Sequence, residues 1–317
     1  LFRHPEIRKQ QMLAAQDIFH QFGITSVMNA LNTTEPWLKT LEELRDDQQL
    51  QLRINTTLLL NDDPDYLIKG ADLARRYPDP KSLLYFWGYK LLADGVGGIH
   101  TAWLTEPYSD RPDTCGYPLA KPELMREWVL DVEKRGFGVH VHAVGNKAVE
   151  FSLDTFAEAE ALGYIKKQRN SITHCDLVND RDFPRFREHH IVAALQPAML
   201  APQAKWQDNL HPSHFGERMK NAWAVKRIYE QAAAVSFSSD SPVTVINPMN
   251  NIFAATQRIH ADGNPPGGIH PEQKVSVAQC LYAYTYGGAY QLGKESWVGS
   301  LAVGKIADIC VLDHNIF

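Results

Sequence analysis

Short apolar runs alternate with longer amphipathic stretches along almost the whole chain, and this alternation constrains the fold more than any other feature of the sequence. It is typical of repeated β–α units in a parallel sheet. Each run is apolar enough to be buried on both faces, as the strands of such a sheet are. The sequence therefore predicts seven strands, at residues 24–30, 52–60, 84–91, 138–142, 170–174, 191–196 and 234–238.

Between the strands, apolar residues recur at helical spacing. Leu124, Trp128 and Val132 are four residues apart, which places them on the face of a helix that would cover the sheet. The segment before the first strand is also predicted to be helical, with Gly23 ending the helix. After the last strand, residues 275–292 predict a further helix.

A helix followed by seven β–α units is one strand short of a closed eight-stranded barrel. We therefore expect an α/β fold, a TIM-type (β/α)8 barrel over residues 1–292, with its first strand upstream of Leu1, so that the chain is a piece of a longer protein. Residues 298–313 are rich in glycine and alternate like β structure. We expect residues 293–317 to begin a C-terminal accessory β-sandwich.

The composition excludes several classes of protein. With 317 residues, 44% of them hydrophobic, the chain can bury a substantial core. Its 32 Lys and Arg residues against 37 Asp and Glu give a net charge of -5, the wrong sign for a surface that binds phosphates, so we expect no nucleic-acid partner. No apolar run approaches the roughly 18 residues of a membrane span, so we expect no membrane partner either.

The four cysteines, Cys115, Cys175, Cys280 and Cys310, are far apart and form no CxxC pair. This spacing argues against a cysteine-based zinc site or a dense set of disulfides, and it favours a reducing compartment. We expect a cytoplasmic protein, although an upstream targeting segment stays open because the chain does not begin with Met. Homo-oligomerisation is also left open.

Polar residues of metal-binding type collect at the ends of the predicted strands, where parallel barrels carry their active sites. Lys90 lies near the end of one strand, His142 and His174 end two others, and Asp240 follows the last. Imidazole and carboxylate suit Zn²⁺, and a lysine does so once carbon dioxide has converted its amine to a carbamate. The sequence therefore predicts a metal site built from Lys90, His142, His174 and Asp240.

Each of these residues also has a structural interpretation. A single histidine at a strand end is more often a hydrogen-bonded structural residue than a ligand. Asp240 could cap the following turn, and the ammonium of Lys90 could bend out to solvent. His140 shares a strand face with His142 but would lie deeper in the barrel. His211 and His214 have metal-compatible spacing, yet they fall in a predicted loop, where lining a pocket or solvent exposure is the alternative.

The motifs of the chain resemble those of the amidohydrolase superfamily, and within it the Amidohydro_3 or YtcJ-like branch, which includes N-substituted formamide deformylases and exoenzyme regulatory proteins. The resemblance covers nearly the whole chain. It rests on GITSV at 23–27, KLLADG at 90–95 with Glu106-Pro-Tyr108, HAVGNKAV at 142–149, ITH at 172–174, SDSPV at 239–243 and GSLAVGKIAD at 299–308.

The resemblance implies a barrel of the metal-dependent hydrolase class, binding one or two zinc or other divalent ions. Lys90 would be a carboxylated lysine that bridges the metals, His142 and His174 would be ligands, and Asp240 would bind metal and handle the proton. A metal-activated water would then hydrolyse an amide-like C–N bond of a small molecule, with N-substituted formamides as one candidate class. The family's His-x-His pair would lie on the missing first strand.

Departures from the family pattern lie near the mouth of the expected site. The usual Gly-Asp-Arg is Gly145-Asn146-Lys147 here, and His100 stands where an arginine is common. We expect His100, Asp94 and His214 to bind substrate, with a preference that differs from that of better-known members. The alternative function is a non-catalytic relative that binds a metabolite for regulation.

Overall fold

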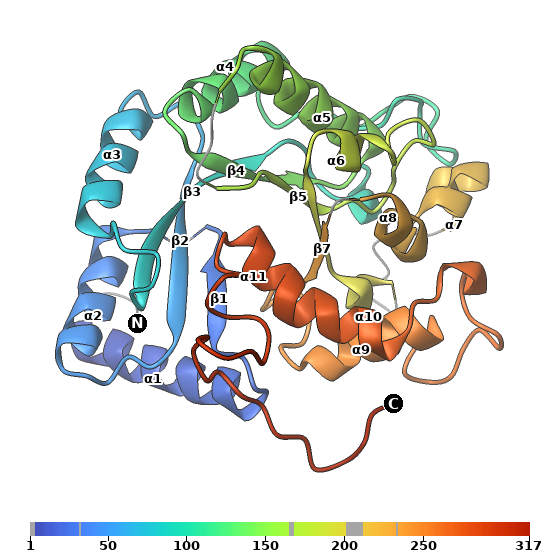
Figure 1. The fold of residues 1–317 in the computed structure, drawn as a ribbon. Helices are drawn as coiled ribbons and strands as arrows, with labels where there is room; N and C mark the ends of the chain where they lie inside the picture. Colours follow the sequence, from blue (N-terminus) through green and yellow to red (C-terminus); the bar gives the residue numbers. More distant parts are fainter. Residues whose placement is uncertain (1–3, 32, 165–167, 201–211, 233) are drawn as a thin grey trace.

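The computed structural model describes residues 4–31, 33–164, 168–200, 212–232 and 234–317. Its centre is one curled sheet of seven strands, all parallel and ordered as they follow one another in the chain (Figure 1). Each of the seven predicted segments overlaps one of these strands, and β3 and β4 each extend one residue further than predicted. They are β1 Ser26–Asn29, β2 Arg53–Leu59, β3 Leu84–Leu92, β4 Gly138–Ala143, β5 Ser171–His174, β6 Val192–Leu195 and β7 Ala234–Phe237.

Helices connect successive strands, as a sheet of parallel neighbours requires. The α-helices are α1 Pro5–Gln21, α2 Glu35–Asp46, α3 Tyr66–Arg76, α4 Pro122–Glu133, α5 Asn146–Ala161, α6 Arg185–Glu188, α7 Pro212–Phe215, α8 Val225–Gln231, α9 Pro248–Gln257, α10 Val277–Tyr282 and α11 Gly288–Gln291. The short 3₁₀ turns are η1 Gly97–Ile99, η2 Pro197–Met199, η4 Gly216–Asn221 and η5 Pro271–Gln273.

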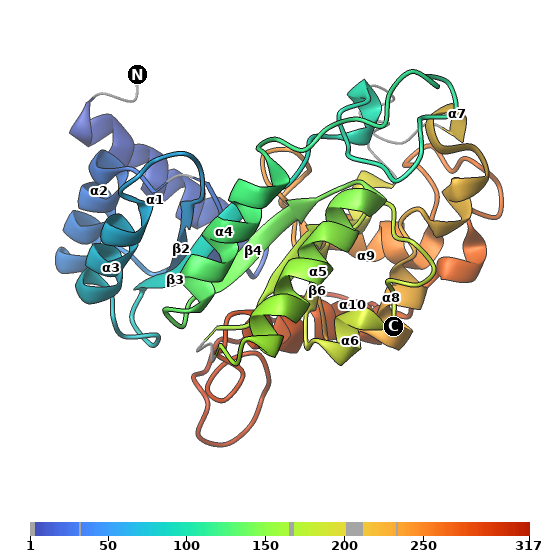
Figure 2. The same cartoon turned by 90° about the horizontal axis from the view of Figure 1, so that it is seen from above.

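The larger helices lie along the outside of the sheet (Figure 2). α3 packs against β2 and β3, α4 and α5 pack against β4, and α8 packs against β7. The core fills the space between the two layers with side chains such as Leu41, Tyr89, Val149 and Phe156, each at most 1% exposed. This outer layer leaves the carboxyl ends of the strands and the loops after them free to carry a site.

A bulge in β3 sets the register of the residues that follow it. Thr56 pairs with Phe86, but Thr57 pairs with Gly88, so Trp87 has no partner opposite it on β2. Gly88 has a φ of +156°, and a Cβ there would lie 2.5 Å from the carbonyl oxygen of Gly138. A glycine is therefore required where β3 and β4 approach each other.

The sheet is open at its two edges. Among the described residues, β1 pairs with β2 alone and β7 with β6 alone, so the expected barrel is seen as a curled half-barrel. The helix predicted over 275–292 is confirmed. It runs through α10, a π-helical turn at Ala283–Gly287 and α11, which packs against β7.

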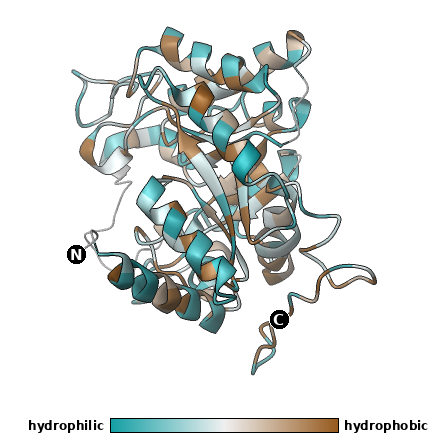
Figure 3. Ribbon diagram, turned by 90° about the vertical axis from the view of Figure 1, so that its left-hand side faces the viewer, coloured by the Kyte–Doolittle hydropathy of each residue, from teal (hydrophilic) through white to brown (hydrophobic). Residues whose placement is uncertain are grey.

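The expectation of β structure in the C-terminal segment is wrong. Residues 298–317 contain no strand, and Figure 3 draws the C-terminal end of the chain as a plain coil. Apolar side chains in this segment, such as Leu301, Val303 and Val311, are at least 80% exposed. An alternating segment becomes a strand only when a neighbouring strand accepts its backbone hydrogen bonds. Here the segment is held by side chains instead, including an ion pair between Arg53 and Asp308. The domain boundary predicted at 292/293 stays a prediction.

No helix among the described residues has both the length and the apolar character that crossing a membrane would require.

Candidate metal centre

Lys90 lies in β3, where it pairs with Leu59 on one side and with His140 on the other. The residue is 4% exposed, so its ammonium does not bend out to solvent as the structural interpretation proposed. Burial lowers the pKa of Lys90 to about 7, and the negative charge of Asp240 opposes this effect. A substantial fraction of the side chain is therefore a free amine at neutral pH, which is the form that reacts with carbon dioxide.

His142 and His174 lie next to each other at the ends of β4 and β5. Their ring centroids are 4.4 Å apart, and the ring planes are inclined by 68°. Burial, together with the nearby Lys90, lowers the pKa of His142 to about 4. Burial and the neighbouring His142 hold the pKa of His174 well below its usual value. Both imidazoles are therefore neutral at pH 7 and can act as ligands.

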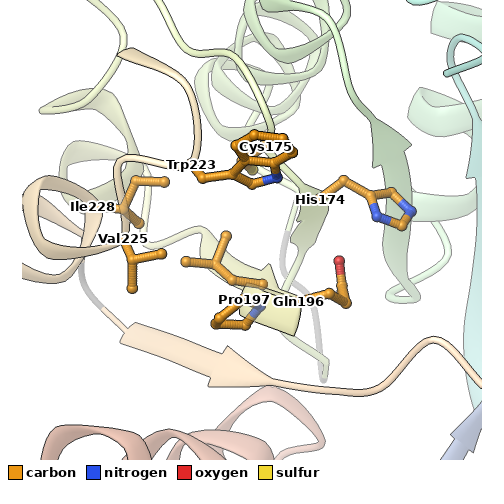
Figure 4. Close-up of a pocket in the computed structure, with 8 residues that line it drawn as sticks. His174, Cys175, Gln196, Pro197, Trp223, Val225 and Ile228 are labelled. Atoms are coloured by element: carbon orange, nitrogen blue, oxygen red, sulfur yellow. The ribbon is translucent and has the colours of Figure 1, made fainter. Parts of the chain in front are cut away.

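The partners of the two rings differ. Nε2 of His142 is 3.0 Å from the carbonyl oxygen of Gly95. Nδ1 of His174 is buried and has no hydrogen-bond partner in the part of the chain that the structure describes. Figure 4 shows the His174 ring on the side of Gln196, turned away from Val225 and Ile228, which line a narrow pocket behind it. A buried nitrogen without a hydrogen-bond partner lowers the stability of the fold, unless a bound ion, water or ligand interacts with it.

The backbone turns sharply at the end of β5, and this turn sets the direction of the His174 side chain. His174 and Cys175 have φ angles of +76° and +53°, in the left-handed region that side chains other than glycine rarely adopt. The amide of Cys175 still donates to the carbonyl of Ala143 on β4, 3.0 Å away. Such strain is frequent at functional sites, where the surrounding structure holds it in place.

His140 lies deeper in the sheet than His142, as its position two residues earlier predicts. Its Nδ1 is 2.7 Å from Oγ of Ser171 and 3.4 Å from Nε2 of Gln291. These contacts engage its ring with β5 and α11. The arrangement accounts for His140 as a hydrogen-bonded residue of the core.

Asp240 lies in the turn after β7, with a φ of +53°. It is exposed on one side, yet burial by the surrounding protein raises the pKa of its carboxyl, while the charge of Lys90 opposes the rise. The Asx cap does not form, since no described residue donates a hydrogen bond to this carboxylate. Asp240, His142 and His174 do not form a group whose ligand atoms all lie within 4.8 Å of one another in the described part of the chain.

Asp94 is 1% exposed and organises the loops around His142. Its carboxylate accepts hydrogen bonds from the backbone amides of Trp103, Val144 and Gly145, at 2.8 to 3.0 Å. Burial raises its pKa to about 7, and the three amides oppose the rise because they favour the ionised form. Both oxygens thus accept hydrogen bonds from the protein's own backbone, and the expected contact of Asp94 with substrate stays a prediction.

The departure at Gly145-Asn146-Lys147 also has a structural role. The side-chain oxygen of Asn146 accepts from the amide of Thr105 at 3.1 Å, and its NH2 group donates to Asn179 at 2.7 Å. Lys147 pairs with Glu150 on the same helix, at 3.1 Å. Asn146 therefore joins the loop after β3 to the loop after β5, in the place where the family pattern has an aspartate.

His100 and His214 come together around an aspartate that the sequence did not single out. Nε2 of His100 is 3.1 Å from each oxygen of Asp110, and Nε2 of His214 is 3.4 Å from one of them. Burial tends to raise the pKa of Asp110, but the hydrogen bond with His100 and the nearby His214 hold it below its usual value. The only sequence signal for Asp110 is its position two residues after Tyr108. His211 lies outside the described residues.

The chain resembles known proteins over most of its length. The model of the Amidohydrolase family, Amidohydro_3, matches residues 5–317. Protein LONG AFTER FAR-RED 3 of Arabidopsis thaliana is 31% identical over 236 residues, which are 73% of this chain and 39% of that protein. N-substituted formamide deformylase of Arthrobacter pascens is 25% identical over 198 residues, 60% of this chain and 34% of that one. The matches thus span well under half of these curated relatives.

A solved structure has the same fold. It belongs to an uncharacterized metal-dependent hydrolase from Pyrococcus horikoshii, which is 26% identical to this chain. The TM-score is 0.82, and the match covers 98% of this chain and 60% of the other. The half-barrel described above is therefore an arrangement that a metal-dependent hydrolase also contains.

Proposed function

The chain belongs to the Amidohydrolase family, and from this membership we propose that the protein is a metal-dependent hydrolase that cleaves amide-like C–N bonds of small molecules. One observation carries the proposal. Two neutral imidazoles, those of the half-buried His142 and the buried His174, have ring centroids 4.4 Å apart and lie beside a buried Lys90 whose pKa is lowered to about 7. Buried groups with perturbed pKa values at the carboxyl ends of parallel strands are typical of a catalytic site.

The residues fit a divalent cation. The buried, unpartnered Nδ1 of His174 among the described residues offers a ligand atom that the protein itself does not satisfy. Lys90, once carboxylated, would add an oxygen ligand of negative charge between the cations. Lys90, His142, His174 and Asp240 would hold one or two ions, and zinc is an ion that such nitrogen and carboxylate ligands bind. Asp240 has to approach the two imidazoles to join them.

When bound, such a cation polarises a substrate carbonyl and lowers the pKa of water. Asp240 supplies the proton chemistry, because its raised pKa lets the carboxylate accept a proton from water and return it to the leaving nitrogen. Asp94 keeps the loops around His142 in position. His100 and His214, on loops that follow the carboxyl ends of β3 and β6, contribute to substrate binding. The products are a carboxylate and an amine.

An amine-release assay tests the proposal. The purified protein, supplied with Zn²⁺ and bicarbonate, is incubated with a panel of N-substituted formamides and longer N-acyl amines. We expect release of the amine from at least one class, and a fall of about 10²-fold or more in Asp240→Asn and His174→Ala. His189→Ala is the matched control, because His189 pairs with Glu160 at 2.8 Å on an outer helix. Saturable binding of panel members without turnover, in metal-loaded protein, would instead support the metabolite-binding alternative.

A further inference from the structure

His100, Asp110 and His214, here called the loop triad, form a second cluster of metal-binding side chains. Among the residues that the structure describes, it is the group of three His, Cys, Asp or Glu side chains whose ligand atoms all lie within 4.8 Å of one another. The two imidazole rings are 4.5 Å apart between centroids. The triad shares no residue with the four metal ligands proposed for the hydrolytic centre, Lys90, His142, His174 and Asp240.

Ring packing and hydrogen bonds between the loop after β3 and α7 position the three side chains. His100 ends η1, Asp110 lies in the loop before α4, and His214 lies in α7. Tyr108, 1% exposed, packs its ring 4.7 Å from that of His100 and donates its hydroxyl hydrogen to the carbonyl of Ala102. The amide of Ser109 donates to the carbonyl of His214 at 2.8 Å.

Arg218, which follows α7, also forms hydrogen bonds with the loop after β3. Its guanidinium donates to the carbonyls of Glu106 and Pro107, at 2.9 and 2.6 Å. Arg111, the other cation near Asp110, pairs with Asp113 at 3.0 Å. Both arginines are therefore engaged elsewhere, and neither neutralises the carboxylate of Asp110.

The two separations between imidazole nitrogen and carboxylate oxygen in the loop triad match those of a coordination sphere. Zinc binds imidazole nitrogen and carboxylate oxygen at about 2.0–2.1 Å, so two ligands of a tetrahedral ion are separated by about 3.3 Å. The observed separations from Nε2 to carboxylate oxygen are 3.1 and 3.4 Å. The side chains of His100, Asp110 and His214 are 21%, 29% and 13% exposed, which leaves solvent access for a fourth ligand.

We propose that the loop triad is a second divalent-cation site of the zinc class. Its ligands are Nε2 of His100, a carboxylate oxygen of Asp110 and Nε2 of His214. Two imidazoles and one carboxylate are a ligand set that holds zinc with a position left open. The bound ion fastens the loop after β3 to α7. This inference goes beyond the proposed hydrolase activity, and it requires none of the metal ligands assigned to that activity, although it shares His100 and His214 with the proposed substrate contacts.

The alternative is a triad held by hydrogen bonds alone, in which both Nε2 atoms donate to Asp110. The two states differ in their response to metal. A hydrogen-bonded triad gains nothing from Zn²⁺, whereas a zinc site binds it and links the two segments more firmly, which raises the melting temperature.

Zinc binding in the variant His142→Ala/His174→Ala separates the two sites. The probe is Zn²⁺ alone, measured by equilibrium dialysis and elemental analysis. We expect one bound ion per chain, a rise of the melting temperature with Zn²⁺, and a loss of affinity of about tenfold or more on adding Asp110→Asn or His214→Asn. His189→Asn, which removes a histidine paired with a single carboxylate, should leave zinc affinity unchanged.

An unchanged zinc affinity after both Asp110→Asn and His214→Asn would overturn the proposal, as would the absence of zinc binding in the folded double variant. If the double variant does not fold, Asp110→Asn in the otherwise unchanged protein should lower the stoichiometry by one ion, and an unchanged stoichiometry overturns the proposal. Absence of amine release from the whole panel in the unsubstituted protein, with this zinc bound, would contradict the proposed hydrolase alone.

Discussion

The imidazole rings of His142 and His174 contact each other at 4.4 Å between centroids, although they belong to different strands. The register of β4 and β5 produces this contact, since His174 pairs with Ala143, the neighbour of His142. Neither ring accepts a proton easily, because burial lowers the pKa of both. Two adjacent neutral imidazoles with an unsatisfied nitrogen are the feature on which the account of a metal centre depends.

Replacing Lys90 tests the role of the buried amine. We expect Lys90→Ala to lower both activity and bound metal, because the carbamate ligand is lost, and short carboxylic acids to restore part of each. Lys294→Met is the matched control, since Lys294 is also buried with a pKa lowered to about 7. It lies against Tyr85 and Trp297, away from the histidines, and should keep its metal. Full activity in Lys90→Ala would show that Lys90 has no role in metal binding and is only a residue of β3.

Lys294 should also make stability depend on pH. Burial, with the nearby Arg53, lowers its pKa to about 7 in the folded chain, against 10.5 for an ordinary lysine. Between these values Lys294 is protonated in the unfolded chain but neutral in the folded chain. The free energy of unfolding therefore falls as the pH falls toward 7. From pH 9 to pH 7 the protein should lose about 2 kcal/mol relative to Lys294→Met. Urea titrations of both proteins at several pH values measure this difference, and parallel curves would show that Lys294 stays charged.

Asp94→Asn should destabilise the protein although the side chain keeps its size. The carboxylate accepts three backbone amides, and the NH2 group of asparagine leaves at least one of them without an acceptor. We expect the free energy of unfolding to fall by about 2 kcal/mol, within the range of one orphaned buried donor. Asp113→Asn, at an exposed carboxylate paired with Arg111, should change it by less than about 0.5 kcal/mol. Equal effects in the two variants would contradict the positioning role of Asp94.

Gly145→Ala tests the close contact of two loops. An added Cβ would lie 2.1 Å from the carbonyl oxygen of Trp103, and neither backbone can move without disturbing the start of α5. We expect a loss of about 1–3 kcal/mol in the free energy of unfolding. Gly288→Ala is the control, because it has an ordinary helical φ and its nearest neighbour is 4.0 Å away. That change should stabilise the chain by up to about 1 kcal/mol in thermal unfolding, whereas an unchanged stability of Gly145→Ala would show that the two loops can separate freely.

Much of the fold is predictable because buried strands leave a direct trace in the sequence. The run that contains β3 is apolar on both faces, and that is the condition for burial between two layers. The C-terminal segment shows the limit of this reasoning. Its alternation resembles that of a strand, but residues 298–317 have no neighbouring strand to pair with. The π-helical turn at Ala283–Gly287 was also beyond prediction, since helical spacing does not distinguish it from an α-helix.

The candidate site is predictable only in part. Strand ends pointed to His142 and His174, because the carboxyl ends of parallel strands meet at one edge. The place of Asp240 depends on the backbone of the turn after β7, where its φ is +53°, and the spacing of apolar residues does not report such an angle. Asp110 follows no strand and joins His214 only through the folding of a loop. The three amides that bind Asp94 come from two loops, so its role could be seen only in three dimensions.

The central claim is that His142 and His174 share a metal ion, and a crystal structure with anomalous scattering measured at the zinc edge tests it most directly. For crystals grown with Zn²⁺, we predict a peak about 2.0–2.1 Å from a ring nitrogen of each histidine. Lys90 and Asp240 should complete the sphere. A map in which the two rings contact each other, with no anomalous peak beside either of them, would contradict the account.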